Sequence, residues 1–191
     1  WLGEKELFYE EVARIPMIVV DPSAASDATR GTKDSRFVES IDLIPTFMEL
    51  AGCDELPDHW LEGRSLVPLL RGAKDVEWRD AAFCECDYAI RHARNTLDIG
   101  PEDCRSYMVR NERWKFVLYE GYRPQLFDME NDPGELNDLG GDPDYEVIRR
   151  EMSDRLFEWM RKRKLRTALS NADIAKRTGS AKKRGYFFGV W

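Results

Sequence analysis

RIPMIVV at residues 14–20 and SIDLIPTFMELAG at residues 40–52 decide the fold. Within the first segment, residues 15–20 form an apolar run without polar alternation, which predicts a strand covered on both faces. The second segment repeats apolar residues at helical spacing, with Ser40 or Asp42 as a cap and Gly52 as terminator, and predicts an amphipathic helix. One helix covers only one face of such a strand. The other face needs a layer from later in this chain or from sequence outside it.

Length and composition narrow the class of protein. The 191 residues are 42% hydrophobic and 34% charged, which fits one large or two small globular domains. A formal net charge of -7 argues against a nucleic-acid partner, and no apolar run approaches the ~20 residues of a membrane span. No signal peptide is visible, so we expect a cytoplasmic location with no membrane partner. The first residue is Trp1, not methionine, and we expect the numbering to begin inside a longer chain.

Two groups of potential metal ligands are better explained as structure. The four cysteines lack paired Cys-x-x-Cys spacing, so small buried side chains with reduced thiols are expected at Cys53, Cys84, Cys86 and Cys104. Acidic residues gather between residues 128 and 144, but without the ligand spacing of a calcium loop. Pro133-Gly134 indicates a turn there. We expect no metal site in this chain.

The second half of the chain predicts a small antiparallel sheet covered by a helix. Short strands are expected at residues 82–88, 106–110, 114–119 and 125–128, with tight connections. The longest helix should begin at Asp142-Pro143, with Asp142 as cap. Its apolar stripe covers one face of the sheet and consists of Tyr145, Ile148, Met152, Leu156 and Trp159. We take the segment from about Asp75 onward as a separate subdomain.

The tail from Arg177 to Trp191 is expected to be an assembly arm. A basic collar leads into GYFFGVW at residues 185–191, and so many aromatic side chains at a chain end are unfavourable unless buried. Burial of each is worth ~1.5–3 kcal/mol, enough together to hold the arm on a second subunit of a homo-oligomer. The alternative is that the tail folds back on its own small domain.

The catalytic inventory of the chain is poor, but its motifs form a familiar series. The two histidines, His59 and His92, belong to no metal-binding pair or nucleophile motif. The series of motifs nonetheless resembles the C-terminal half of sulfatases over at least residues 1–140. It consists of Lys5, Arg14-Ile15-Pro16, SIDLIPT at 40–46, Leu50-Ala51-Gly52, GRSL at 63–66 with Pro68-Leu69-Leu70, Trp114-Lys115-Phe116 and LFDMENDPGELNDL at 126–139. CDY at 86–88, GPEDC at 100–104 and the extended tail are most similar to the phosphonate monoester hydrolase and choline sulfatase branch.

This resemblance implies an alkaline-phosphatase-like α/β fold, of which the chain carries only the C-terminal part. Residues 1–74 would be the end of the catalytic α/β domain, with the last main-sheet strand and its helices. Residues 75–164 would be a small α+β subdomain, in which a long C-terminal helix packs on an antiparallel four-stranded sheet. Residues 165–191 would be the basic and aromatic tail.

The resemblance also implies a reaction. A hydrated formylglycine, made from Cys or Ser in a Cys/Ser-x-Pro-x-Arg motif, attacks a sulfate or phosphonate ester, and a divalent metal (Mn, Ca or Zn) held by Asp, Asn and His stabilises the charge. This sequence contains no such motif. The nucleophile and the metal ligands are therefore missing, and no metal is expected in this chain alone.

Three residues match positions near the active site of the resembled family. Lys5 matches the lysine that contacts the transferred group and the nucleophile, where a fixed cation would stabilise developing negative charge. The alternative is that Lys5 is a solvated lysine in a polar segment, without a role in catalysis. Arg14 is expected to brace the strand and the active-site loop. His59 lies where a substrate-pocket loop would be and is a candidate for substrate binding.

We therefore expect the C-terminal portion of a metal-dependent sulfatase or phosphonate monoester hydrolase, inactive by itself. The substrate would be a small-molecule sulfate or phosphonate ester. Two alternatives remain open. One is an arylsulfatase or choline sulfatase of the same fold, and the other is an interaction module that kept the scaffold and lost the chemistry.

Overall fold

The computed structural model describes residues 7–53, 60–163, 169–177 and 183. The chain divides into two compact units. One joins Trp1–Val38 to Asp75–Lys162, and the other joins Glu39–Lys74 to Arg163–Trp191. The domain boundaries expected at residues 74 and 164 remain predictions.

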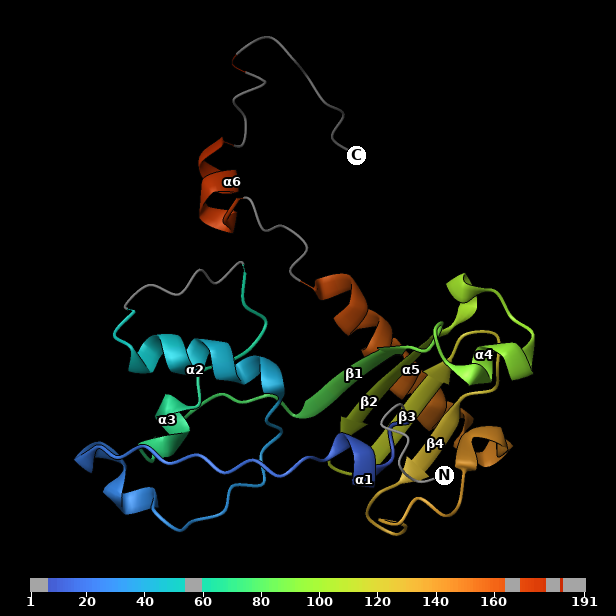
Figure 1. The fold of residues 1–191 in the computed structure, drawn as a ribbon, viewed down its shortest axis with the longest axis horizontal. Coiled ribbons are helices and arrows are strands. Elements are labelled where there is room, and N and C mark those ends of the chain that lie inside the picture. The colour runs from blue at the N-terminus through green and yellow to red at the C-terminus, as the bar shows by residue number, and fades with distance from the viewer. Residues whose placement is uncertain (1–6, 54–59, 164–168, 178–182, 184–191) are drawn as a thin grey trace. The chain divides into compact units, whose positions relative to one another are not determined.

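A four-stranded antiparallel sheet in the order β1-β2-β3-β4 forms the centre of the first unit (Figure 1). The strands are β1 (Ala81–Asp87), β2 (Arg105–Asn111), β3 (Trp114–Tyr119) and β4 (Gln125–Asp128). The predicted small antiparallel sheet is thereby confirmed. The β2–β3 hairpin is closed by Asn111, whose Oδ1 accepts hydrogen bonds from the backbone N–H groups of Arg113 (3.0 Å) and Trp114 (2.6 Å).

The long helix α5 (Glu146–Lys162) packs on one face of this sheet (Figure 1). Met152 and Leu156 of its predicted stripe are buried, and they join a core whose other buried members are Ala81, Tyr107, Val109, Phe116 and Leu126. A 3-10 turn at Pro143–Tyr145 precedes the helix, and the carboxylate of Asp142 caps it by accepting from the backbone N–H of Asp144. The stripe, the cap and the covered face all agree with the expectation from the sequence.

The opposite face of the sheet is covered by the N-terminal segment. Phe8 is buried against Met108 of β2 and Val117 of β3, and the short helix α1 (Glu10–Ala13) follows directly. Side chains alternate across a strand, so Phe116 faces α5 while Lys115 and Val117 face α1. The sheet is thus the middle layer of three, and both of its faces have a cover.

The predicted buried strand at residues 15–20 is wrong for this structure. No strand is assigned there, and Ile15, Ile18 and Val20 are 62%, 90% and 72% exposed. A strand exists only when a neighbour accepts and donates its backbone hydrogen bonds. No strand in the described part of the chain pairs with this segment. The segment is therefore apolar and exposed, and no described strand forms backbone hydrogen bonds with it.

The remaining elements are short. They are the helices α2 (Leu43–Leu50), α3 (Val67–Leu70), α4 (His92–Leu97) and α6 (Asn171–Arg177), and the 3-10 turns Ala24–Thr29, Ser40–Asp42, Pro101–Asp103 and Leu139–Gly141. None of the described helices is both long and apolar enough to cross a membrane.

In the second unit, two buried polar side chains join α2 to the loop before α3. The carboxylate of Asp42, which is fully buried, accepts from the backbone N–H of Glu39 (2.8 Å) and of Arg64 (2.7 Å). Thr46 Oγ1 donates to the Asp42 carbonyl and accepts from the Leu66 N–H at 2.9 Å. Asp42 therefore closes a loop as well as the first turn, and the SIDLIPT and GRSL motifs are two sides of one contact.

Gly63→Ala should destabilise the second unit, because its Cβ would lie 2.0 Å from the Ile41 carbonyl oxygen. Overpacking against backbone costs about 1–3 kcal/mol of unfolding free energy. Gly134→Ala is the matched control, since its Cβ would meet only the Leu136 side chain, with its nearest atom at 3.6 Å. Urea unfolding of both variants checks this. Equal midpoints for Gly63→Ala and the control would contradict the close approach.

Candidate functional site

A buried lysine lies between the sheet and the N-terminal segment. The side chain of Lys115 on β3 is fully buried, and its Nζ donates a hydrogen bond to the Phe8 carbonyl at 2.8 Å. The same Nζ forms ion pairs with Glu10 Oε1 and Glu135 Oε1, each at 2.8 Å. An ammonium has three donors, and here three oxygens surround it. We call Lys115, Glu10 and Glu135 the lysine anchor.

Arg110 balances the charge of the lysine anchor. It lies directly opposite Lys115 in the β2–β3 register, where two like charges repel each other. Glu10 Oε1 contacts both, at 3.2 Å from Arg110 Nε and 2.8 Å from Lys115 Nζ. Two cations and two carboxylates sum to zero. A group whose charges balance is the form in which charges are tolerated in a protein interior.

The electrostatics of Glu10 follow from this arrangement. Burial alone would raise the pKa of the Glu10 carboxyl, but its contacts with Lys115 and Arg110 outweigh burial and hold that pKa below its ordinary value. The carboxylate therefore stays ionised at neutral pH. Because the folded-state pKa is depressed, its contribution to stability is lost only as the pH falls through acidic values.

Glu135 reaches the anchor from a strained turn. Its φ is +54°, in the left-handed region that few non-glycine residues adopt. This backbone follows Pro133-Gly134 and is fixed by a hydrogen bond from the Glu135 N–H to the Asp132 carbonyl (3.1 Å). Its Oε2 accepts from the Glu10 N–H at 2.6 Å. The turn thus binds both Lys115 and the start of α1.

Asp128 ends β4 and lies at the start of the segment that leads to this turn. Its carboxylate accepts from Arg113 Nη2 (2.9 Å), Asn131 Nδ2 (2.9 Å) and the backbone N–H groups of Glu130 and Asn131. The Arg113 guanidinium, with help from these other donors, lowers the pKa of Asp128 to about 2. These hydrogen bonds hold residues 130 and 131 to Asp128, and the predicted turn at Pro133-Gly134 follows, closed by the bond from the Glu135 N–H to the Asp132 carbonyl.

Asp128→Asn should lower the unfolding free energy at neutral pH by about 1–2 kcal/mol, a value discounted because Arg113 is half exposed. The folded pKa lies below the ordinary 3.8, so the stabilisation is present above that value and lost as the pH falls toward about 2. Urea unfolding should show the gap to wild type shrinking by about half near pH ~3. Exposed Asp144→Asn is the control. A pH-independent gap would contradict this origin.

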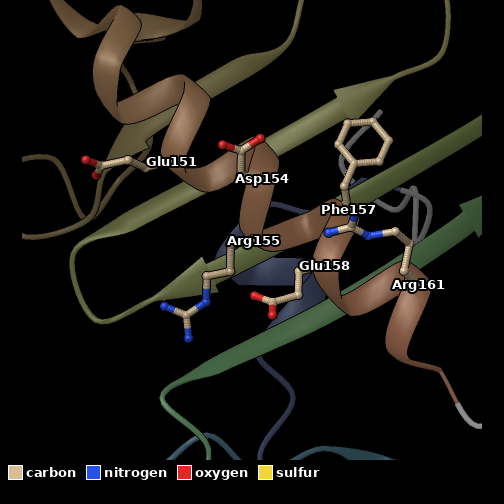
Figure 2. Close-up of a pocket in the computed structure, with 6 residues that line it drawn as sticks. All are labelled: Glu151, Asp154, Arg155, Phe157, Glu158 and Arg161. Carbon is tan, nitrogen blue, oxygen red and sulfur yellow. The ribbon is translucent and has the colours of Figure 1, made fainter. Parts of the chain in front are cut away.

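A shallow hollow on α5 offers no comparable chemistry (Figure 2). It is lined by Glu151, Asp154, Arg155, Phe157, Glu158 and Arg161. Both charge signs are mixed there, and its members pair locally, as Arg155 does with Asp80 and Glu158 with Lys162. A solvated helix surface explains the hollow without a ligand.

Metal ligands do not converge in the described part of the chain. Within residues 7–53, 60–163 and 169–177, no three His, Cys, Asp or Glu side chains are placed to hold an ion. These residues do not fit a catalytic metal. The expectation of small buried cysteines holds for Cys104 and is wrong for Cys53 and Cys84, which are exposed on a loop and on the sheet edge strand.

Two of the three residues singled out from the sequence, Lys5 and His59, lie outside the described residues. Arg14 is described: it ends α1, its backbone N–H bonds the Glu10 carbonyl at 2.9 Å, and its side chain is exposed. The bracing role of Arg14 stays a prediction.

The sequence reasoning missed the lysine anchor, although it quoted two of its members within motifs. The available signal was a charged residue inside the apolar strand Trp114–Tyr119, whose alternation places Lys115 on the face opposite Phe116. Its partners Glu10 and Glu135 are 125 residues apart, and no local pattern connects them.

Comparison with known proteins assigns the chain to a class. Residues 1–162 match the family described as N-sulphoglucosamine sulphohydrolase, C-terminal, and the chain belongs to this family of sulfatase and phosphonate monoester hydrolase C-terminal domains. The Multifunctional alkaline phosphatase superfamily protein PehA of Trinickia caryophylli is 32% identical over 152 residues, which are 78% of this chain and 29% of PehA. The choline-sulfatase of Rhizobium meliloti (strain 1021) is 32% identical over 148 residues, 74% of this chain and 25% of that enzyme.

The fold agrees with this assignment. The phosphonate monoester hydrolase of Agrobacterium radiobacter superposes with a TM-score of 0.59 at 34% sequence identity, over 66% of this chain and 25% of that chain. The expected resemblance to sulfatases and the α/β fold class are confirmed. This chain spans between a quarter and a third of the length of these relatives.

Proposed function

We propose that this chain acts as the C-terminal portion of a metal-dependent hydrolase that cleaves small sulfate or phosphonate esters. The observation that carries the proposal is the family match over residues 1–162 together with identities of 32–34% to proteins named as PehA, choline-sulfatase and phosphonate monoester hydrolase. The formylglycine nucleophile and the Mn, Ca or Zn ion would be supplied by sequence outside this chain.

The exposed apolar side chains support the proposal that this chain is only part of a hydrolase. Ile18 is 90% exposed in a segment that reads as a buried strand. On α2 and the turn before it, Ile41, Ile44, Phe47 and Leu50 are between 44% and 59% exposed at helical spacing. A group of exposed apolar side chains on one element indicates a partner. The preceding part of a longer polypeptide would cover these side chains. It would also provide the main sheet in which residues 15–20 form a strand.

Within this proposal Lys5 would contact the transferred group and stabilise its developing negative charge, since a preorganised cation lowers the barrier to an anionic transition state. His59 would lie on the substrate side of the site, and Arg14 would brace the adjacent segment. The tail from Arg177 to Trp191 would hold two subunits together; all but Arg177 and Lys183 lie outside the described residues, so this part rests on the sequence alone.

The chain by itself should neither hydrolyse these esters nor bind a divalent metal tightly, because one lysine supplies neither a nucleophile nor a ligand set. The test assays the chain and the longest natural polypeptide that contains it, on p-nitrophenyl sulfate, a p-nitrophenyl phosphonate monoester and choline sulfate. Titration calorimetry with Mn²⁺, Ca²⁺ and Zn²⁺ accompanies the assay.

We expect turnover only by the longer polypeptide, and the preferred ester separates phosphonate monoester hydrolase from arylsulfatase and choline sulfatase. Turnover and stoichiometric metal binding by the chain alone would contradict the proposal. No turnover by the longer polypeptide would favour the interaction module.

A further inference from the structure

We propose that residues 8–13 form an acid-sensitive strap, which leaves the small sheet as a unit while the sheet and α5 stay folded. The strap consists of Phe8, Tyr9 and the short helix α1, and the lysine anchor holds it on β3. All the contacts that hold it lie between described residues, and none depends on the proposed function.

Little apolar surface holds the strap in place. Of residues 8–13 only Phe8 is buried, and it packs on Met108 and Val117. No described strand pairs with the strap. The opposite face of the sheet has a larger core of seven buried side chains, two of them from α5. Local opening occurs where few apolar contacts are buried, so the strap can open while the core under α5 persists.

Polar contacts at its first three residues fix the strap instead. Lys115 Nζ donates to the Phe8 carbonyl at 2.8 Å, and the Glu10 N–H donates to Glu135 Oε2 at 2.6 Å. Glu10 Oε1 lies 2.8 Å from Lys115 Nζ and 3.2 Å from Arg110 Nε. Each of these contacts includes a charged side chain. Their strength therefore depends on the ionisation of the two carboxyl groups.

Acid removes the charge balance beneath the strap. At neutral pH the carboxylates of Glu10 and Glu135 offset Lys115 and Arg110, which lie directly opposite each other in the β2–β3 register. Protonation of both carboxyl groups leaves two cations side by side, and Lys115 is fully buried. Like charges in register repel, and a buried charge without a partner is costly. Opening of the strap relieves both effects, because water then reaches Lys115.

The other titratable groups that face the strap cannot restore this balance. They are the phenols of Tyr9 and Tyr119 and the thiol of Cys86, which carry no charge in acid. Burial alone would raise the pKa of Glu10, but its cationic neighbours hold it below the ordinary 4.5. The stabilisation is therefore complete above that value and is lost as the pH falls through the folded pKa. The buried members of the core under α5 carry no charge that acid could alter.

The test follows amide hydrogen exchange in the full chain, expressed as protection relative to the unfolded chain at the same pH. The N–H groups of Val12 and Ala13 both bond the Tyr9 carbonyl at 2.8 Å, so their protection reports the closed strap. Amides of α5 report the core. A titration of the wild-type chain from pH ~7 to pH ~3.5 covers the loss of both carboxylates.

Three variants separate the charge effect from general damage. Glu10→Gln with Glu135→Gln imitates the protonated carboxyl groups at neutral pH. Glu146→Gln with Glu158→Gln neutralises two exposed, paired carboxylates on α5 and is the matched control. Lys115→Met with Glu135→Gln removes the buried cation and leaves Glu10 to pair with the cation on β2.

In the wild-type chain the strap should lose ~10–100-fold of its protection in acid, while α5 changes by less than ~3-fold. The double glutamine variant of the strap should show the same loss at neutral pH, and the control variant should show none. The variant without Lys115 should keep its strap closed in acid, because no buried cation is then left unpaired.

Equal losses in the strap and α5 would overturn the strap as a separate unit. Full strap protection in the double glutamine variant, or wild-type acid opening in the variant without Lys115, would overturn its control by charge. If the double glutamine variant does not fold, the acid titration of the wild-type chain and of the variant without Lys115 decides.

Discussion

Lys5→Ala, in the longest natural polypeptide that contains this chain, is expected to lower kcat by about 10²–10³-fold, with folding unchanged. Removing one preorganised donor to an anionic transition state has an effect of this size. In the transfer of a sulfuryl or phosphonyl group, negative charge grows on the leaving oxygen, and a fixed ammonium stabilises it more in the transition state than in the ground state. Steady-state kinetics with an aryl ester measure the change.

Arg14→Ala separates this effect from damage to the adjacent segment. Its side chain is exposed at the end of α1, so its replacement should leave kcat near the wild-type value, and any effect of the expected bracing role should appear in stability. A Lys5→Ala enzyme that turns over near the wild-type rate would show that Lys5 is a solvated lysine without a role in catalysis.

Lys115→Met in this chain is expected to lower the free energy of unfolding by about 3–5 kcal/mol. The substitution keeps most of the side-chain volume but leaves the Glu135 carboxylate, whose side chain is 1% exposed, without its cation. The cost comes from the orphaned charge and not from lost packing. Urea unfolding followed by circular dichroism measures it.

Two further variants test that origin. Lys115→Met combined with Glu135→Gln should recover part of the loss, because no buried charge then lacks a partner. Lys74→Met, at an exposed position, should change the unfolding free energy by less than ~0.5 kcal/mol. If the double variant were less stable than Lys115→Met, the orphaned charge would not explain the effect.

The sheet and its helix could be predicted from the sequence because the signals are local. Residues 114–119 and 125–128 are strands in the structure as expected, since apolar and aromatic residues there are bounded by turn formers. The stripe that includes Met152 and Leu156 is buried because helical spacing places its members on one side. The same reasoning located Gly52, which ends α2 with a φ of +78°.

Residues 15–20 show where local signals fail. The apolar run has the composition of a buried strand, but strand formation depends on a neighbour, and composition does not say where that neighbour is. The described residues offer none. The sequence pattern therefore indicates that the segment could form a buried strand. In the structure of this chain the segment is exposed.

The lysine anchor could not be predicted for a related reason. Each of its residues looks solvated when considered alone, because lysine and glutamate are mostly exposed. Only the register that sets Lys115 opposite Arg110, and the turn that reverses the chain before Glu135, show that these charges meet. Lys115 and Glu135 lie within motifs of the resembled family. Those motifs locate the two residues in the sequence but do not indicate that their charges meet.

We propose that this chain is one part of a larger ester hydrolase. The most direct measurement compares the rate of p-nitrophenyl ester hydrolysis by the longest natural polypeptide with that of the same polypeptide lacking residues 1–191. We expect turnover by the first polypeptide and none by the second, because the proposed catalytic Lys5 is lost with residues 1–191. Equal rates for both would contradict it.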